Sequence, residues 1–489
     1  MAERSERRCT WRKRAEALES ELSDTRSELE ELRQKTSLLD EKIEGLNQKL
    51  FGKRSERQRI PSVTAEVNKR RPASHAEKQN KRRALAALKA NIESVPERPP
   101  IDHDQCHCEF CGDGPEQFTL IGSKTSTVYS IPRTKTIKKV ITRDTLACHC
   151  GKTMVSAPAP KRFGKSQYDV SVAAHLIVGK CTDSMPVARQ AEQMTREGVP
   201  TSRATLNRIF LRAGSLLSPV AKWILDRIAS SELVLADETP MRQQDQDSKG
   251  YFWVFSNEQL TAYVYSPSRS GETPKNVLGN SKGDLVVDGY TGYNQVTTPG
   301  KRWRSGCNAH ARRKFCEAKP KTPEAQRAID LYNELFVIER DAQQQGIVGT
   351  AAHLKLRQQR SAPIVEKLYS WLEHQKPLHL PKGKMGEAIS YALNNQIELT
   401  RFLSDPKIPI SNNHSERQLR VVASGRKNYQ SVGNESAGQK IATLYTLTAC
   451  CKAAGINPTI YLTDVLERLE IDPDIPIEEL LPHNWKPPG

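Results

Sequence analysis

The chain has 489 residues, enough for about three domains with sizeable cores. Its 74 lysines and arginines outnumber 57 aspartates and glutamates, and the net charge of +17 favours an anionic partner, with nucleic acid as the leading candidate. No apolar stretch approaches the roughly 20 residues of a membrane span, and no apolar segment follows the charged N-terminus as in a secretory signal. We therefore expect a cytoplasmic protein without a membrane partner, in which clustered cysteines indicate metal ligands rather than disulfides.

The first 50 residues carry a heptad pattern, with alternating steps of three and four between mostly apolar positions. These positions are Trp11, Ala15, Leu18, Leu22, Thr25, Leu29, Leu32, Thr36, Leu39, Ile43, Leu46 and Leu50. The pattern predicts a coiled coil over 1–50 that joins at least two copies of the chain. A single amphipathic helix packed on its own core is the alternative.

Residues 51–100 are basic and end in a proline-rich linker. Between Lys53 and Lys89 there are twelve lysines or arginines against three glutamates. Such a run is usually a solvated or disordered face. Its length and one-sided charge favour an arm that follows DNA phosphates.

Residues 101–160 contain two cysteine pairs, Cys108 with Cys111 and Cys148 with Cys150. Two pairs on turns can bind a structural Zn²⁺ ion tetrahedrally, as in a zinc ribbon. The second pair is spaced C-x-C rather than C-x2-C, so the fourth ligand is open, with Cys106, His103, His107 and His149 as spare candidates. Incidental buried cysteines are the alternative.

Residues 161–230 alternate helical patterns with short turns, and Thr201 or Ser202 can cap one of the helices. Two short helices joined by a glycine turn are typical of a helix-turn-helix DNA-binding region. Generic helical packing fits nearly as well.

Residues 231–310 predict five strands. The apolar run LVLADET from Leu233 indicates a buried strand with Asp237 at its C-terminal end, and LVV before Asp288 repeats this arrangement. Aromatic runs at 251–255 and 260–265 predict a hairpin, 273–279 a helix, and 302–307 a fifth strand. Three antiparallel strands, a helix, a strand, then a strand and a helix is the order of an RNase H-like domain.

Residues 311–405 are polar and helical, and we interpret them as a helical insertion. The core resumes over 406–470 with a helix that opens at Ser411 or one of the following asparagines and carries Glu416 in its first or second turn. Residues 471–489 are expected to form a C-terminal tail. The fold class is therefore multidomain α+β: a coiled coil, a zinc-ribbon-like module, a helical region and an RNase H-like α/β core with an insertion.

Several separate strings, in order, resemble the insertion sequence 66 family of bacterial transposases across nearly the whole chain. They are FGKRSER, CEFCG, LVLADETP, LVVDGYTGY, GCNAHARRKF, SNNHSERQLR and GINPTIYLTDVL. The resemblance implies a DDE transposase in which Asp237, Asp288 and Glu416 form the metal-binding triad. It also implies a zinc-binding N-terminal module. The C-x2-H pair of Cys307 and His310 is similar to a motif of related transposases and is assigned to DNA contact or support of the metal site.

The implied activity is cleavage of double-stranded DNA at the terminal inverted repeats of the element and joining of the 3′-OH ends to target DNA. Two Mg²⁺ or Mn²⁺ ions held by the three carboxylates would serve both steps. Accessory proteins encoded by the same element are expected as further partners, in the bacterial cytoplasm at the nucleoid. Six basic residues are expected to bind flanking phosphates: Arg312, Arg313, Arg417, Arg420, Arg426 and Lys427.

Two other functions fit part of the sequence. In a regulatory DNA-binding protein, the zinc module, arm and coiled coil would act alone and the acids would be structural. In a junction resolvase on the same core, the substrate would be a DNA shape rather than particular ends.

Overall fold

The computed structural model describes residues 79, 145–147, 154–156, 162–199 and 201–487. The expected coiled coil, the basic arm apart from Gln79, and all four predicted zinc ligands lie outside these residues. Within the predicted zinc region, strand β1 (Thr145–Ala147) pairs antiparallel with β2 (Met154–Ser156).

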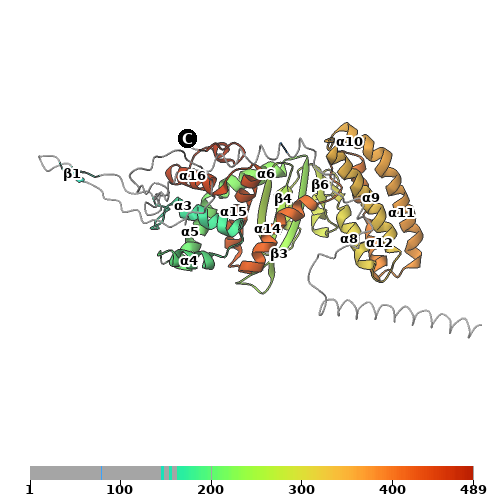
Figure 1. The fold of residues 1–489 in the computed structure, drawn as a ribbon, viewed down its shortest axis with the longest axis horizontal. Helices are drawn as coiled ribbons and strands as arrows, with labels where there is room; N and C mark the ends of the chain where they lie inside the picture. Colours follow the sequence, from blue (N-terminus) through green and yellow to red (C-terminus); the bar gives the residue numbers. More distant parts are fainter. Residues whose placement is uncertain (1–78, 80–144, 148–153, 157–161, 200, 488–489) are drawn as a thin grey trace, which may run out of the picture. The chain divides into compact units, whose positions relative to one another are not determined.

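A mixed β-sheet forms the centre of the described chain (Figure 1). Its strands lie in the order β5-β4-β3-β6-β7, in which β3, β4 and β5 are antiparallel and β3, β6 and β7 are parallel. Their bounds are β3 Leu233–Gln243, β4 Lys249–Ser256, β5 Thr261–Ser266, β6 Gly283–Val287 and β7 Arg302–Gly306. A short strand β8 (Ser431–Val432) pairs with the end of β3. The expected hairpin, the order of the five strands and the helix before β6, α7 (Glu272–Leu278), are confirmed and agree with an RNase H-like fold.

Two hydrophobic cores lie against this sheet, and the alternation of β3 separates them. Val234 and Ala236 belong to the first core, whereas Leu235 belongs to the second. Successive side chains of a strand point to opposite faces, so the two cores cover opposite faces of β3. Asp237 and Glu238 follow directly, and the same alternation directs them to opposite faces.

The first core joins helices from both ends of the described chain. They are α3 (Val170–Cys181), α4 (Val187–Arg196), α5 (Arg203–Leu216), α6 (Ser218–Ala229), α15 (Glu435–Ala453), α16 (Pro458–Ile471) and α17 (Ile477–Leu480). Ser202 is the N-cap of α5, where its hydroxyl accepts the Thr205 N–H, so one of the two expected caps is confirmed. The helices of 162–230 thus share one core with the sheet.

The C-terminal residues also pack on this first core. The Tyr461 hydroxyl donates to the Leu480 carbonyl at 2.6 Å, and the Trp485 indole N–H donates to Asp464 at 2.8 Å. Leu480, Leu481 and Trp485 are buried. The segment expected as a tail therefore contributes to the core as far as Trp485. None of the described helices is long and apolar enough to cross a membrane.

The second core is built mainly from helices between β7 and α14 (Asn413–Tyr429), the ochre and yellow group in Figure 1. They are α8 (Asn308–Ala318), α9 (Ala325–Gln344), α10 (Ala351–Leu356), η4 (Arg357–Ser361), α11 (Ala362–Gln375), α12 (Lys384–Asn394) and α13 (Gln396–Thr400). Leu235 and Val286 of the sheet pack into the same core. The stretch expected to be helical is helical, and its first helix begins at Asn308 rather than at residue 311.

Candidate active site

Asp237 lies in the middle of β3 and not at its end, which corrects the sequence expectation. The strand continues to Gln243 because its antiparallel partner β4 continues alongside it, with Asp237 opposite Val254. The parallel partner β6 pairs with β3 only as far as Leu235. Asp237 therefore lies just beyond the point where the parallel part of the sheet ends, which is where parallel sheets place their ligands.

The pairing of β3 with β6 ends two residues before each of the two aspartates, at the same end of the parallel strands. Leu235 pairs with Val286, and each aspartate follows its partner by two residues. Because Leu235 and Val286 both pack into the second core, this register directs the two carboxylates to that same face. Asp288 lies one residue after β6 ends, where its Oδ1 accepts the Tyr290 N–H at 2.9 Å.

Helix α14 is hydrogen-bonded to β3 near both of its ends. At the start, the Asn412 side-chain amide donates to the Ala236 carbonyl at 2.7 Å; near the other end, Arg426 Nη1 donates to the Pro240 carbonyl. These carbonyls lie on β3 beyond the part paired with β6, along an edge that has no neighbouring strand until β8 pairs at Arg242. The helix therefore runs along this open stretch of β3.

The N-cap of α14 is one of the residues expected there, but it makes no side-chain capping bond. Asn412 occupies the N-cap position, but its side chain makes no capping bond because it is committed to β3. Its backbone N–H donates to Cys307 Sγ at 3.2 Å, and the Asn412 residue is fully buried. Glu416 falls in the first turn of the helix, as expected.

Glu416 faces the start of α8. Its Oε2 lies 3.3 Å from Arg313 Nη2 and its Oε1 lies 3.7 Å from His310 Nδ1. Ligand atoms of Cys307, His310 and Glu416 all lie within 4.8 Å of one another. The C-x2-H pair singled out in the sequence is therefore placed against the third acid.

The electrostatics of the site are dominated by Asp237. Burial, together with the charges of Glu238, Asp288 and Glu416, raises the pKa of its carboxyl to about 8, against the lowering effect of the hydrogen bond from the Glu238 N–H. The charges of Asp288 and Glu416 thus act on Asp237, whereas among the described residues the group of ligand atoms within 4.8 Å of one another is Cys307, His310 and Glu416. Burial also lowers the pKa of His310 and so favours the neutral imidazole, whereas the charge of Glu416 acts in the opposite direction.

The residues present fit a divalent cation. Within the described chain, Glu416 Oε1 and His310 Nδ1 are buried atoms without a hydrogen-bond partner. Carboxylate oxygens are the ligands that Mg²⁺ and Mn²⁺ prefer. A bound cation would favour the ionised form of Asp237 and thereby offset the cost of keeping this negative charge among other acids.

Glu238 is a buried acid that sequence reasoning did not single out. It alternates to the face opposite Asp237, where Arg269 binds its Oε1 and the Tyr293 hydroxyl donates to its Oε2 at 2.8 Å. Only 2% of its side chain is exposed. Glu238 is fully paired, and its adjacency to Asp237 was the one signal available in the sequence.

The six basic residues proposed for DNA occupy different environments. Arg313, Arg417, Arg420 and Lys427 are exposed. Arg312 is half-buried, with its Nε 2.7 Å from Asn333 Oδ1, and half-buried Arg426 holds the end of β3. The first four are therefore exposed to a phosphate, although Arg313 also pairs with Glu416, whereas Arg312 and Arg426 are half-buried and bind protein groups.

Comparison with known proteins agrees with this geometry. The family described as "Transposase IS66 family" matches residues 165–440, more than half of the chain, and the "IS66 C-terminal element" matches residues 446–483. An uncharacterised protein of Sinorhizobium fredii, y4jD, is 31% identical over 81% of this chain and 82% of its own length. A second protein of that organism, y4qI, is 28% identical over 88% of this chain and 82% of its own length. The chain therefore belongs to the IS66 family of transposases, a catalytic DDE family that acts on DNA.

Proposed function

We propose that this chain cuts double-stranded DNA at the terminal inverted repeats of its insertion sequence and joins the 3′-OH ends to target DNA. Asp237, Asp288 and Glu416 are the catalytic residues. The observation that carries the proposal is the pKa of Asp237, which burial and neighbouring acids raise to about 8. An acid cluster without a compensating cation at this position of the sheet is suited to binding metal.

The three acids have separable tasks in this reaction. Two Mg²⁺ or Mn²⁺ ions, when bound, would lower the pKa of the attacking water or 3′-OH and neutralise the departing oxygen. Asp237 and Asp288, set side by side by the strand register, would hold them from the sheet. Glu416 would complete the site from α14, fixed by the bonds of Asn412 and Arg426 to β3.

Phosphate binding falls to exposed basic side chains around the acids. Arg313 lies 3.3 Å from Glu416, and Arg417 and Arg420 are exposed on the same helix as that acid. Their charge supports the docking of a DNA backbone beside the carboxylates. Arg312 and Arg426 would contribute to the shape of the site rather than to phosphate contacts.

The segments outside the described residues complete the proposal. A coiled coil over 1–50 would pair two copies so that both ends of the element are held together, and the basic arm would follow DNA. Cys108, Cys111, Cys148 and Cys150 would bind a structural Zn²⁺ ion in a module that recognises the ends. Proteins encoded by the same element would assist, in the bacterial cytoplasm.

The test is mobilisation in cells. A marked element with its native ends and neighbouring genes is supplied with the wild-type chain or with Asp237→Asn, Asp288→Asn or Glu416→Gln. We expect new insertions with the wild-type chain and, with each variant, a drop of roughly a thousandfold or more, because a bound metal contributes several kcal/mol to transition-state stabilisation.

Two controls make the result specific. Glu232→Gln removes an exposed carboxylate just before β3, 3.6 Å from Lys407, and should mobilise the element normally. Each inactive variant should still retard a duplex carrying the inverted repeat. A triad variant that mobilises the element at the wild-type frequency would remove that residue from the site.

A further inference from the structure

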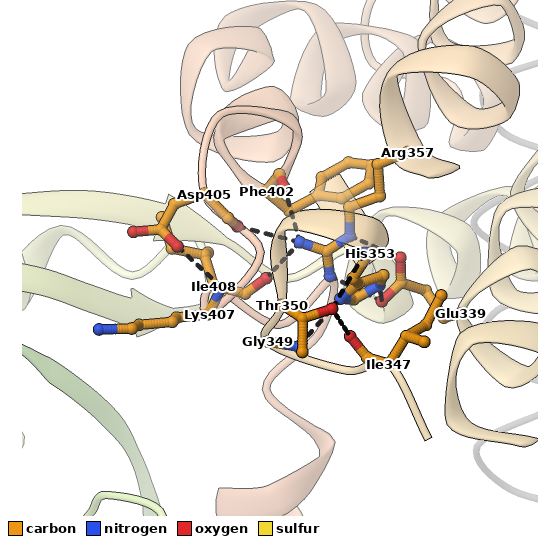
Figure 2. A network of polar contacts seen from close by, with 10 residues as sticks. All are labelled: Glu339, Ile347, Gly349, Thr350, His353, Arg357, Phe402, Asp405, Lys407 and Ile408. Carbon is orange, nitrogen blue, oxygen red and sulfur yellow. Dashed lines mark hydrogen bonds and ion pairs between the residues drawn. The ribbon is translucent and has the colours of Figure 1, made fainter. Parts of the chain in front are cut away.

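Arg357 is a buried arginine far in sequence from the three acids. It opens the π-helical turn η4, and only 1% of its side chain is exposed. Its Nε and Nη2 donate to the two carboxylate oxygens of Glu339 on α9, at 2.8 and 2.7 Å. Figure 2 shows this guanidinium between Glu339 and the segment of Phe402, Asp405 and Ile408.

The third guanidinium nitrogen hydrogen-bonds to the backbone of that segment. Nη1 lies 2.7 Å from the Phe402 carbonyl and 3.0 Å from the carbonyls of both Asp405 and Ile408 (Figure 2). The guanidinium also lies 5.2 Å from the centre of the Phe402 ring. One side chain thus fixes the conformation of residues 402–408, which we call the 402–408 turn.

The chemistry of this contact requires arginine. The planar guanidinium offers five donors in a fixed geometry, which can bind a carboxylate bidentately and still reach carbonyls on its far side. A lysine has three donors on a single nitrogen and cannot span both partners. Without the arginine, the buried carbonyls of Phe402 and Ile408 would lose a charged donor.

The 402–408 turn leads directly to the helix of the third acid. Beyond Ile408, the Ile410 carbonyl accepts the backbone and side-chain N–H groups of Asn308, at 3.1 and 3.2 Å. Two residues later, Asn412 binds both Cys307 and Ala236. Glu416 follows within one helical turn.

We propose that Arg357 is a positioning residue for Glu416: by fixing the 402–408 turn it sets where α14 begins and therefore where the third carboxylate meets the metal. The proposal rests on the proposed function, since it assumes that Glu416 is a metal ligand. It assigns to the helical segment between β7 and α14 the task of bracing the third acid against the sheet. Arg357 itself contacts neither metal nor DNA.

The test measures Mn²⁺ binding by the full-length chain, with Mn²⁺ alone as the probe, by titration calorimetry at a temperature well below unfolding. Glu416→Gln should raise the Kd of the site about tenfold or more. Arg357→Met should raise it by a similar factor, since groups that orient a metal ligand are worth about 10- to 100-fold in affinity. Combining both changes should raise the Kd no further than Glu416→Gln alone, because Arg357 acts only through Glu416.

The matched control is Arg360→Met. Arg360 lies on the same π-helical turn and also pairs with α9, at 2.8 Å from Asp341, but its side chain is 48% exposed and, among the described residues, it hydrogen-bonds to that acid alone. The Kd of the Arg360→Met variant for Mn²⁺ should equal that of the wild-type chain. If Arg357 has only a structural role, Arg357→Met will have a lower thermal midpoint than the wild-type chain but the same Kd for Mn²⁺. That result would overturn the inference.

Two further outcomes are distinguishable. If the wild-type chain and Glu416→Gln bind Mn²⁺ equally, the proposed function fails and this inference with it. If Glu416→Gln weakens binding and Arg357→Met does not, only the inference fails. Should Arg357→Met not fold, Arg357→Lys keeps the charge but loses the bidentate geometry, and it must show the same dependence on Glu416.

Discussion

The acid cluster and the Arg357 contact are the two most highly charged buried places described above, and they are built on opposite rules. At the acid cluster, burial and three nearby acids raise the pKa of Asp237, and the Glu416 Oε1 atom has no hydrogen-bond partner. At Arg357, every guanidinium nitrogen has a partner, and both oxygens of Glu339 accept from it. Among the described residues, Asp237 pairs with no basic side chain and Arg313 reaches only Glu416, whereas the second site is complete.

This difference separates function from support. Burying charge without compensation costs folding free energy, so such a group persists where a ligand will later offset the cost. A complete pair such as Arg357 with Glu339 needs no ligand and acts by fixing neighbouring backbone. Glu238 obeys the second rule although it is next to Asp237, because Arg269 and Tyr293 occupy its oxygens.

The largest expected effect on folding comes from breaking the complete site. Arg357→Met should lower the free energy of unfolding by about 3–5 kcal/mol, because it removes the bidentate partner of Glu339 and leaves that carboxylate with His353, 3.4 Å away. Urea unfolding followed by circular dichroism measures the change. Arg357→Met combined with Glu339→Leu should recover part of the loss, since it removes both charges; no recovery would mean that the carbonyls of the 402–408 turn dominate.

The incomplete site should respond in the opposite direction, and with pH. The pKa of Asp237 rises from an ordinary 3.8 to about 8 in the folded chain, so this group favours folding below about pH 4 and loses that contribution as the pH rises towards 8. In chelator, Asp237→Asn should therefore match the wild-type chain near pH 4 and exceed its stability by several kcal/mol near pH 8.5, since each tenfold change in proton affinity is worth about 1.4 kcal/mol. Added Mg²⁺ should close that gap by stabilising only the wild-type chain.

A paired aspartate on the neighbouring strand provides the contrast. Asp284 of β6 lies 2.6 Å from Arg401 Nε, so Asp284→Asn should destabilise the chain at pH 8.5 instead of stabilising it. Thermal melts at the two pH values compare both variants. Stabilisation by both substitutions would show that net charge, rather than the acid cluster, sets the pH dependence.

The sheet and the two aspartates could be predicted because their signals are local. Short apolar runs marked the strands, and a parallel pairing of two similar runs places the residues that follow them side by side. The length of β3 could not be predicted, since the polar stretch from Asp237 to Gln243 pairs as strand only through β4. Pro240 is tolerated there because no β6 residue needs its missing N–H.

The hydrogen bonds that fix the start of α14, and with it the position of Glu416, could not be predicted either. Asn412 binds a carbonyl 176 positions away, and Arg357 binds carbonyls 45 to 51 positions away. An asparagine before a helix ordinarily caps that helix, and an arginine in a polar helix ordinarily faces water. The residue types therefore gave no indication that these two side chains bind distant carbonyls. The expected coiled coil and zinc module stay predictions.

The smallest effect on stability should come from Arg313, which lies beside the third acid of the acid cluster. Its side chain is 54% exposed and 3.3 Å from Glu416, so Arg313→Ala should change the free energy of unfolding by less than about 1 kcal/mol. If it binds a phosphate, the slope of log K against log salt for the inverted-repeat duplex should fall in magnitude by about one. Arg340, exposed on α9, is the control, and Arg340→Ala should leave that slope unchanged. Equal slopes for both variants would limit Arg313 to its contact with Glu416, and the charge beside the third acid would then serve the metal site rather than the DNA.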